Sequence, residues 1–94
     1  MGRLDKRIAL VTGGGSGLGK ADCQRMAKEG AIVYVSDVNF AAAEEVARAI
    51  GGGAVALKHD VASEDDWKAV YARIAADHGR LDILVNNAGI VVVA

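Results

Sequence analysis

Proline is absent from this chain of 94 residues, and cysteine, histidine and aromatic residues are scarce. The single cysteine, Cys23, excludes an internal disulfide, and no Cys/His pair accompanies it, so we expect it to be neither a reactive thiol nor a metal ligand. The two histidines, His59 and His78, have no partners at ligand spacing, and we expect surface or capping roles for them. These absences argue against metal chemistry and against cysteine chemistry.

An excess of one charge and a long apolar segment are also lacking. The chain carries 11 Lys and Arg against 12 Asp and Glu, so no basic surface indicates nucleic acid or anionic lipid. Its apolar runs are too short to cross a bilayer, and its charged start lacks the apolar segment of a signal peptide. We therefore expect a cytoplasmic protein that binds a small molecule and neither nucleic acid nor membrane.

What is present is enough apolar material for one folded unit, since hydrophobic residues make up 52% of the chain. Apolar and β-branched runs predict strands at residues 7–12, 31–36, 54–58 and 82–85. Helices are predicted from the glycine-rich segment 13–19 to Lys28, over residues 40–50, and from Ser63 to Gly79. This strict alternation predicts the α/β class, with parallel strands joined by right-handed crossovers in a doubly wound sheet.

Side-chain patterns add detail to the second and third predicted helices. Asn39 is a good N-cap for the helix over 40–50, and Ser63 with Asp66 resembles a capping box in its acidic variant. One face of the second helix is apolar, formed by Phe40, Ala43, Ala47 and Ile50. We expect a stripe of the third helix to be core, formed by Trp67, Val70, Tyr71 and Ile74.

The glycine-rich segment over residues 12–19 reads TGGGSGLG and joins a buried strand to a helix. Backbone N–H groups at such a helix start can hold a phosphate. Its spacing is T-G-x-x-x-G-x-G and does not match G-x-G-x-x-G. A P-loop is an alternative, because Gly14 and Gly19-Lys20 have its spacing, but Ala21 replaces the required Ser or Thr. A third interpretation is that the glycines only permit a tight turn.

Polar residues at the ends of the other predicted strands favour a dinucleotide site. Asp37 ends the second strand 20 residues after Gly17, where a carboxylate can accept hydrogen bonds from the adenosine ribose and repel a 2′-phosphate. No Arg or Lys lies in residues 13–19 to neutralise such a phosphate. The residues therefore favour NAD over NADP as the cofactor.

Four spaced motifs together resemble the short-chain dehydrogenase/reductase family along essentially the whole chain. They are the glycine segment, the acid Asp37, the pair Asp60-Val61, and LDILVNNAG over residues 81–89. The resemblance implies a Rossmann-like sheet with strand order 3-2-1-4. It also implies roles for individual residues. Asn86 would brace the sheet through its amide. The implied cofactor-binding residues are Gly13, Ser16, Gly17 and Leu18 at the pyrophosphate and ribose, Asp37 at the ribose, Asp60 and Val61 at the adenine, and Asn87, Ala88 and Gly89 toward the nicotinamide.

The family's catalytic residues have no counterpart in this chain. By resemblance, hydride transfer between NAD(H) and an alcohol or carbonyl substrate uses a serine, an asparagine and the pair Y-x-x-x-K, all after the segment 86–89. Tyr34 is followed at that spacing by Val38, and Tyr71 by Ala75, so neither has the lysine that lowers the phenol pKa. We therefore expect residues 1–94 to be the N-terminal, cofactor-binding part of a single Rossmann domain without the C-terminal catalytic part, and inactive alone.

Two further expectations concern association. The resemblance implies a homo-oligomer, and a non-catalytic dinucleotide-binding or self-associating module is the alternative function. The outer side of the strand over 82–85 is expected to be an exposed edge from which the apolar residues 91–93 extend.

Overall fold

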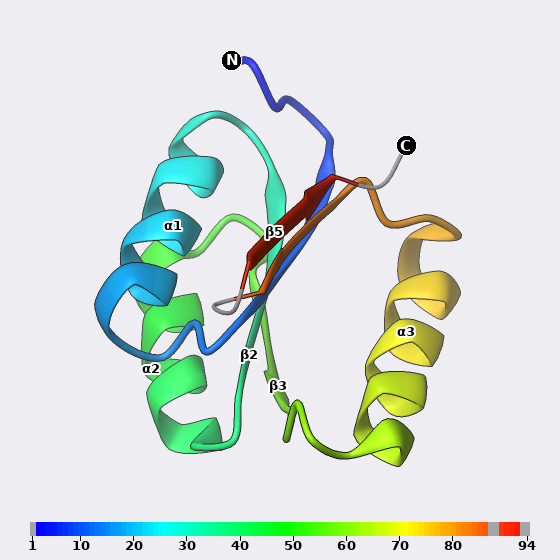
Figure 1. The fold of residues 1–94 in the computed structure, drawn as a ribbon. Coiled ribbons are helices and arrows are strands. Elements are labelled where there is room, and N and C mark those ends of the chain that lie inside the picture. The colour runs from blue at the N-terminus through cyan, green and yellow to red at the C-terminus, as the bar shows by residue number, and fades with distance from the viewer. Residues whose placement is uncertain (1, 87–88, 93–94) are drawn as a thin grey trace.

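Strands and helices alternate along residues 2–86 and 89–92, which are the residues that the computed structural model describes (Figure 1). The strands are β1 (Ile8–Thr12), β2 (Ile32–Asp37), β3 (Val55–Lys58), β4 (Ile83–Asn86) and β5 (Gly89–Val92). The helices are α1 (Gly17–Lys28), α2 (Phe40–Ile50) and α3 (Glu64–His78). Each of the seven predicted elements is present, and every predicted strand end lies within one residue of the observed end.

The strand order in the sheet is β3-β2-β1-β4-β5. The strands β1 to β4 are parallel, which confirms the predicted doubly wound sheet with order 3-2-1-4. Thr12 pairs with Ser36, and Asp37 pairs with Lys58, so the carboxyl ends of β1, β2 and β3 meet at one edge of the sheet. The loops that follow these strands are thereby brought together.

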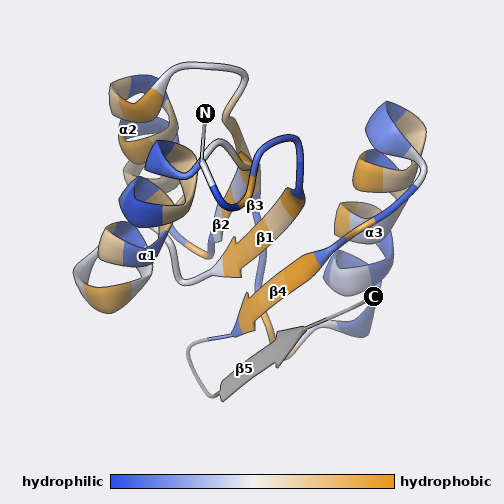
Figure 2. Ribbon diagram, turned by 90° about the horizontal axis from the view of Figure 1, so that it is seen from above, coloured by the Kyte–Doolittle hydropathy of each residue, from blue (hydrophilic) through white to orange (hydrophobic). Residues whose placement is uncertain are grey.

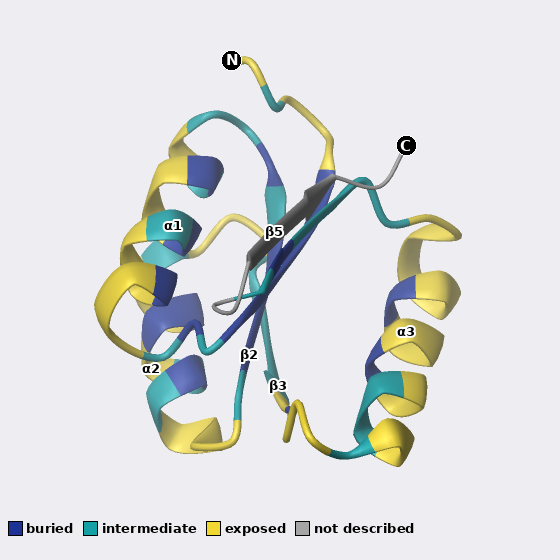
Figure 3. Ribbon diagram, in the orientation of Figure 1, coloured by how far each residue is buried: buried dark blue, intermediate teal, exposed yellow. Residues whose placement is uncertain are grey.

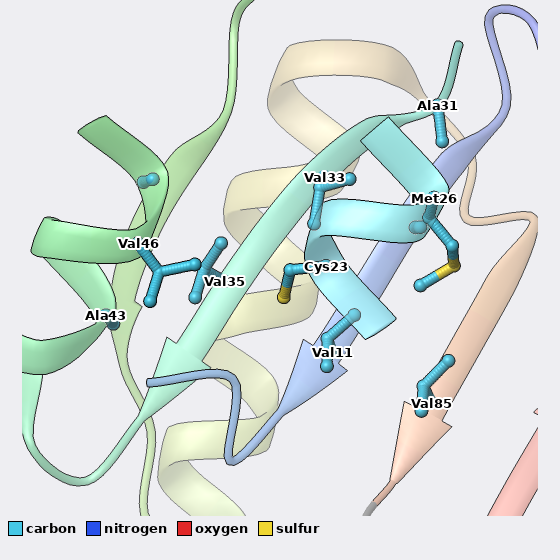
Figure 4. Close-up of a cluster of buried hydrophobic side chains, with 11 residues drawn as sticks. Val11, Cys23, Met26, Ala31, Val33, Val35, Ala43, Val46 and Val85 are labelled. Carbon is cyan, nitrogen blue, oxygen red and sulfur yellow. The ribbon is translucent and has the colours of Figure 1, made fainter. Parts of the chain in front are cut away.

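The core consists of two layers because the central strands are buried on both faces. Helices α1 and α2 cover one face and α3 covers the other (Figure 1). Alternate residues of β1 enter opposite layers: Val11 packs with Cys23 and Val35 on the α1 side (Figure 4), whereas Leu10 packs with Tyr34 on the α3 side. The strands β1 and β4 are accordingly apolar over most of their length (Figure 2).

The strand β5 was not predicted, and it changes the expected sheet edge. It pairs with β4 in the antiparallel direction, from Asn86 opposite Gly89 to Ile83 opposite Val92. The prediction that β4 itself would present an exposed edge is therefore wrong. The outer backbone groups of β4 need hydrogen-bond partners, and the segment that follows supplies them by folding back. Val93 lies outside the described residues.

The predicted helix caps are present. The Asn39 side chain accepts a hydrogen bond from the Ala42 amide at 3.1 Å, and Ser63 Oγ accepts one from the Asp66 amide at 3.1 Å. The Asp66 carboxylate does not complete the capping box, because it accepts a hydrogen bond from the Asp60 amide at 2.8 Å instead. The acid of this motif thus fixes the loop after β3.

The apolar stripes predicted for α2 and α3 are buried only in part. Val70 and Ile74 of α3 are buried, whereas Tyr71 is 41% exposed, and Phe40 at the start of α2 is 42% exposed. Figure 3 shows that α3 buries a narrow face toward the sheet while the rest of its surface is exposed. A helix that packs against one sheet face covers a limited arc, and residues at the border of the stripe remain in solvent.

Candidate functional site

The glycine segment forms the turn between β1 and α1. Gly13 and Gly17 have φ values of 64° and 57°, which other residues rarely adopt. A Cβ at Gly19 would collide with the carbonyl oxygen of Gly13, and a Cβ at Gly15 would lie 2.9 Å from Asp37 Oδ2. The turn is therefore packed so closely against itself and against the end of β2 that glycine is required at several positions.

Asp37 connects this turn to the end of β2. Its Oδ2 accepts a hydrogen bond from the Gly15 amide at 3.0 Å, and its Oδ1 accepts one from the Asn39 amide at 2.9 Å. The backbone adds a third link, since the Gly14 amide donates to the Ser36 carbonyl at 2.9 Å. The carboxylate is held in place by backbone donors, and each oxygen retains a lone pair for another donor.

A cavity of about 340 Å³ lies at the carboxyl edge of the sheet, beside Asp37. It is lined by Thr12, Gly13, Asp37, Val38, His59, Asp60, Val61 and Asn86. Val38 and Val61 are 64% and 50% exposed, so two apolar side chains are left in solvent at the rim. The cavity thus combines a carboxylate with apolar surface, as small-molecule sites do.

The structure brings four of the predicted site residues together in this cavity: Gly13, Asp37, Asp60 and Val61. Ser16, Gly17 and Leu18 do not line it and instead form the start of α1. Gly89 begins β5, and Asn87 and Ala88 lie outside the described residues. The predicted site residues therefore form two groups, one in the glycine turn and one in the cavity. Gly13 belongs to both groups, and the Asp37 carboxylate lines the cavity while it bonds the Gly15 amide of the turn.

Sequence reasoning missed Thr12 and Val38 as lining residues. Val38 directly follows Asp37, and an apolar residue in a polar loop after a strand was the available signal. Thr12 Oγ1 lies 3.4 Å from the Val85 carbonyl oxygen and 3.3 Å from Asn86 Oδ1. Asn86 thus contacts β1 through its amide, in the bracing role that the sequence predicted for it.

His59 was predicted to be a surface or capping residue, and this is wrong. It is 2% exposed and its Nδ1 lies 3.0 Å from Ser36 Oγ. Burial lowers its pKa, although the carboxylates of Asp66 and Asp60 oppose this effect. His59 continues the alternation of β3, in which Val55 and Leu57 face the α3 layer, and this places the imidazole under that helix.

Cys23 lies behind the glycine turn in the α1 layer. Burial, assisted by the carboxylate of Asp22, raises the pKa of its thiol to about 12. A Cβ at Gly14 would approach its Sγ to 3.1 Å. A protonated, buried thiol in contact with the turn is a packing residue, as its isolation in the sequence indicated.

Residues 2–86 and 89–92 contain neither a cluster of metal-binding side chains nor a membrane-spanning helix. No group of three or more His, Cys, Asp or Glu side chains in this part of the chain could hold a metal ion. Likewise, no helix within it is long and apolar enough to cross a membrane.

Known proteins of one family are similar to this chain both in sequence and in structure. A family model described as short chain dehydrogenase matches residues 7–94. A 3-beta-hydroxysteroid dehydrogenase from Comamonas testosteroni is 46% identical over 88 residues, which are 94% of this chain and 35% of the relative. A cyclopentanol dehydrogenase from Comamonas sp. (strain NCIMB 9872) is 46% identical, over 96% of this chain and 37% of the relative.

Solved structures show the same relationship. A 3-ketoacyl-(acyl-carrier-protein) reductase from Brucella melitensis, complexed with NADH, superposes with a TM-score of 0.82 and 41% identity, over 86% of this chain and 33% of that one. A hydroxysteroid dehydrogenase from Escherichia coli gives a TM-score of 0.83 and 40% identity, over 89% and 37%. The chain thus spans about a third of the length of these proteins.

Proposed function

The chain belongs to the short-chain dehydrogenase family, and we propose that it is the dinucleotide-binding part of an NAD-dependent oxidoreductase. The reaction proposed for the whole protein is hydride transfer between NAD(H) and an alcohol or carbonyl substrate. The observation that carries the proposal is the cavity at the carboxyl edge of the sheet, where Asp37, Val38, Asp60 and Val61 meet.

The cavity fits the adenosine half of a dinucleotide. A purine ring is flat and apolar on both faces, and it needs apolar contacts such as those that Val38 and Val61 offer at the rim. The Asp37 carboxylate is fixed by the amides of Gly15 and Asn39 and can accept hydrogen bonds from two neighbouring ribose hydroxyls. We assign the adenine to Asp60 and Val61, and the ribose to Asp37.

The start of α1 fits the pyrophosphate. Asn39 and Ser63 cap α2 and α3 with their side chains, but Ser16 makes no such bond to α1. The first amides of α1 therefore lack a side-chain cap, and an anion can take that place. Leu18, which is 80% exposed, can cover the bound group. We assign Gly13, Ser16, Gly17 and Leu18 to the phosphates, and Asn87, Ala88 and Gly89 to the nicotinamide side.

NAD is proposed over NADP because the Asp37 carboxylate would repel a 2′-phosphate on the ribose that it binds. The similar reductase that is complexed with NADH supports a nicotinamide dinucleotide as the cofactor. The alcohol or carbonyl substrate is supported by the names of the relatives, a hydroxysteroid dehydrogenase and a cyclopentanol dehydrogenase.

The bound nicotinamide would supply the chemistry by accepting or delivering hydride. The residues of this chain would bind and orient the cofactor, and we propose that they do so without turnover, since Tyr34 and Tyr71 lack a lysine four residues on. Residues 1–94 are thus proposed to be part of one Rossmann domain. The cytoplasmic location and the homo-oligomeric state also stay predictions.

Calorimetric titration of the purified chain with NAD and NADP tests the proposal. We expect NAD to bind and NADP to bind at least about tenfold more weakly, which corresponds to about 1.4 kcal/mol. Equal affinity for the two would contradict the role of Asp37, and a folded chain that binds neither would contradict the site. A second assay adds secondary alcohols with NAD, and formation of NADH by the chain alone would contradict the absence of catalytic residues.

A further inference from the structure

A buried polar link joins the end of β2 to the loop after β3, and His59 is its centre. Ser36 Oγ lies 3.1 Å from the Val11 carbonyl oxygen and 3.0 Å from His59 Nδ1. A carbonyl oxygen only accepts, so the single hydroxyl hydrogen of Ser36 is donated to Val11. His59 Nδ1 must then donate to Ser36 Oγ, so Nδ1 carries a hydrogen.

The other side of the imidazole contacts α3. The ring centroids of His59 and Trp67 are 4.2 Å apart, and the rings stand at 89° to each other. Trp67 Nε1 in turn donates to the Val61 carbonyl at 2.9 Å. The Asp60 amide donates to Asp66 Oδ2 at 2.8 Å, so both residues of the loop are fixed to α3. His59 therefore lies between the end of β2 and the helix that holds Asp60 and Val61.

These contacts join two parts of the cavity lining. One part consists of Asp37 and Val38, which directly follow Ser36, and the other of Asp60 and Val61, which directly follow His59. The backbone joins the same two parts, because the His59 amide donates to the Asp37 carbonyl at 3.0 Å. The His59 side chain thus bonds the end of β2 and packs on α3, the helix to which Asp60 and Val61 are bonded.

We propose that His59 is a positioning residue of the adenosine side of the site, whose buried imidazole holds Asp60 and Val61 in place relative to Asp37 and Val38. The inference rests on the proposed function, because it takes the cavity as the place of the adenosine. It goes beyond that function by assigning the cavity's geometry to a buried imidazole.

The protonation state of His59 makes this role sensitive to pH. Within residues 2–86 and 89–92, its Nε2 is buried and has no hydrogen-bond partner. Protonation would add an N–H there without an acceptor, and an unsatisfied buried donor is costly. The charged groups that face the ring are the carboxylates of Asp60 and Asp66, which favour the proton, while burial disfavours it more strongly and lowers the pKa. The neutral ring is thus the form that positions the loop.

Two substitutions separate positioning from general stability. His59→Asn retains an amide N–H near the position of Nδ1 for Ser36 and cannot titrate, whereas His59→Leu retains the bulk and loses the hydrogen bond. Binding of NAD and of inorganic pyrophosphate is measured by calorimetry at pH 7.5, because pyrophosphate probes only the glycine turn. We expect His59→Leu to weaken NAD about tenfold and to leave pyrophosphate unchanged, and His59→Asn to bind NAD within about threefold of the unsubstituted chain.

The pH profile gives the second readout. Between pH 7.5 and 5.5, NAD affinity should fall for the unsubstituted chain and for the control His78→Asn, which replaces an exposed histidine at the end of α3. It should stay flat for His59→Asn. If His59→Leu does not fold, as judged by thermal melting, the comparison of His59→Asn with His78→Asn carries the test.

The outcomes distinguish this inference from the proposed function. A folded, unsubstituted chain that does not bind NAD contradicts both. If the unsubstituted chain binds NAD and His59→Leu binds it equally, or loses NAD and pyrophosphate to the same extent, only the positioning role is overturned. An identical pH profile for His59→Asn and the unsubstituted chain overturns it as well.

Discussion

At the scale of single residues, the Asp37 carboxylate is the group on which cofactor preference depends. Replacement by asparagine keeps an oxygen for the Gly15 amide but removes the charge. Charge-assisted hydrogen bonds are roughly twice as strong as neutral ones, so Asp37→Asn should weaken NAD about tenfold. It should also narrow the preference for NAD over NADP, because the repulsion of the 2′-phosphate is lost. Titrations with both cofactors measure this.

The control is Asp65→Asn, which removes the same charge from an exposed position in the first turn of α3. Its ratio of NAD to NADP affinity should match that of the unsubstituted chain. An unchanged ratio in Asp37→Asn would remove Asp37 from the selectivity.

His59 also predicts how the stability of the fold depends on pH. Because burial lowers its pKa in the folded chain, the unfolded chain binds the proton more tightly. The stabilisation is therefore present above the unfolded pKa of about 6.5 and is lost as the pH falls through the lower, folded value. Asp77 and Asp82, whose pKa values are lowered by hydrogen bonds, lose their contributions only in stronger acid.

The expected result is a melting temperature that decreases between pH 7 and 5 in the unsubstituted chain and less in His59→Asn. Thermal melts followed by circular dichroism at half-unit steps would show it. Parallel curves for the two proteins would mean that His59 titrates alike in the folded and unfolded states.

Residue identity alone could predict part of the site. Asp37 and Asp60 could be predicted as site residues because ligands bind at the carboxyl ends of the strands in such sheets. The structure brings both residues to one cavity. His59 was misjudged because histidine is polar, although its place in the alternation of β3 indicated the buried face. The residue type of His59 predicted an exposed side chain, but packing against α3 buries it.

At the scale of elements, α3 is the helix whose packing differs most from expectation. Ile74 is 1% exposed and Tyr71 is 41% exposed, although both lie on the apolar stripe. Ile74→Ala should cost about 2–4 kcal/mol of unfolding free energy, because it leaves a cavity against the sheet. Tyr71→Ala should cost less than about 1 kcal/mol. Urea denaturation of the two variants tests the difference, and equal losses would contradict the observed orientation of α3.

The ends of the elements were predicted well because their signals are local. Asn39 and Ser63 cap their helices as expected, since a cap needs only the next three residues. The strand β5 could not be predicted in this way, because it forms only through pairing with β4. The Asp66 carboxylate likewise bonds the Asp60 amide rather than its own helix end, a choice that depends on the position of the loop after β3.

At the scale of the whole molecule, the sheet ends in β5, whose outer side has no neighbouring strand among residues 2–86 and 89–92. Free strand edges pair with other chains, so we expect the protein to self-associate as its concentration rises. Val91→Lys should reduce this association, because a charge at an edge opposes pairing. Sedimentation velocity over a range of concentrations measures it.

Ala72→Lys is the matched control, since it adds the same charge on the exposed side of α3. It should associate like the unsubstituted chain. If Val91→Lys and Ala72→Lys change the association equally, net charge rather than the β5 edge is responsible.

The carboxyl edge of the sheet is proposed to hold the adenosine side of a dinucleotide. A titration of the ¹⁵N-labelled chain with NAD, followed by amide chemical shifts, tests it most directly. We predict that the shifts concentrate in three segments: residues 13–19, 37–38 and 60–61. A folded spectrum without shifts, or shifts confined to the depression between α1 and α2 at Gln24, Lys28 and Ile50, would contradict the claim.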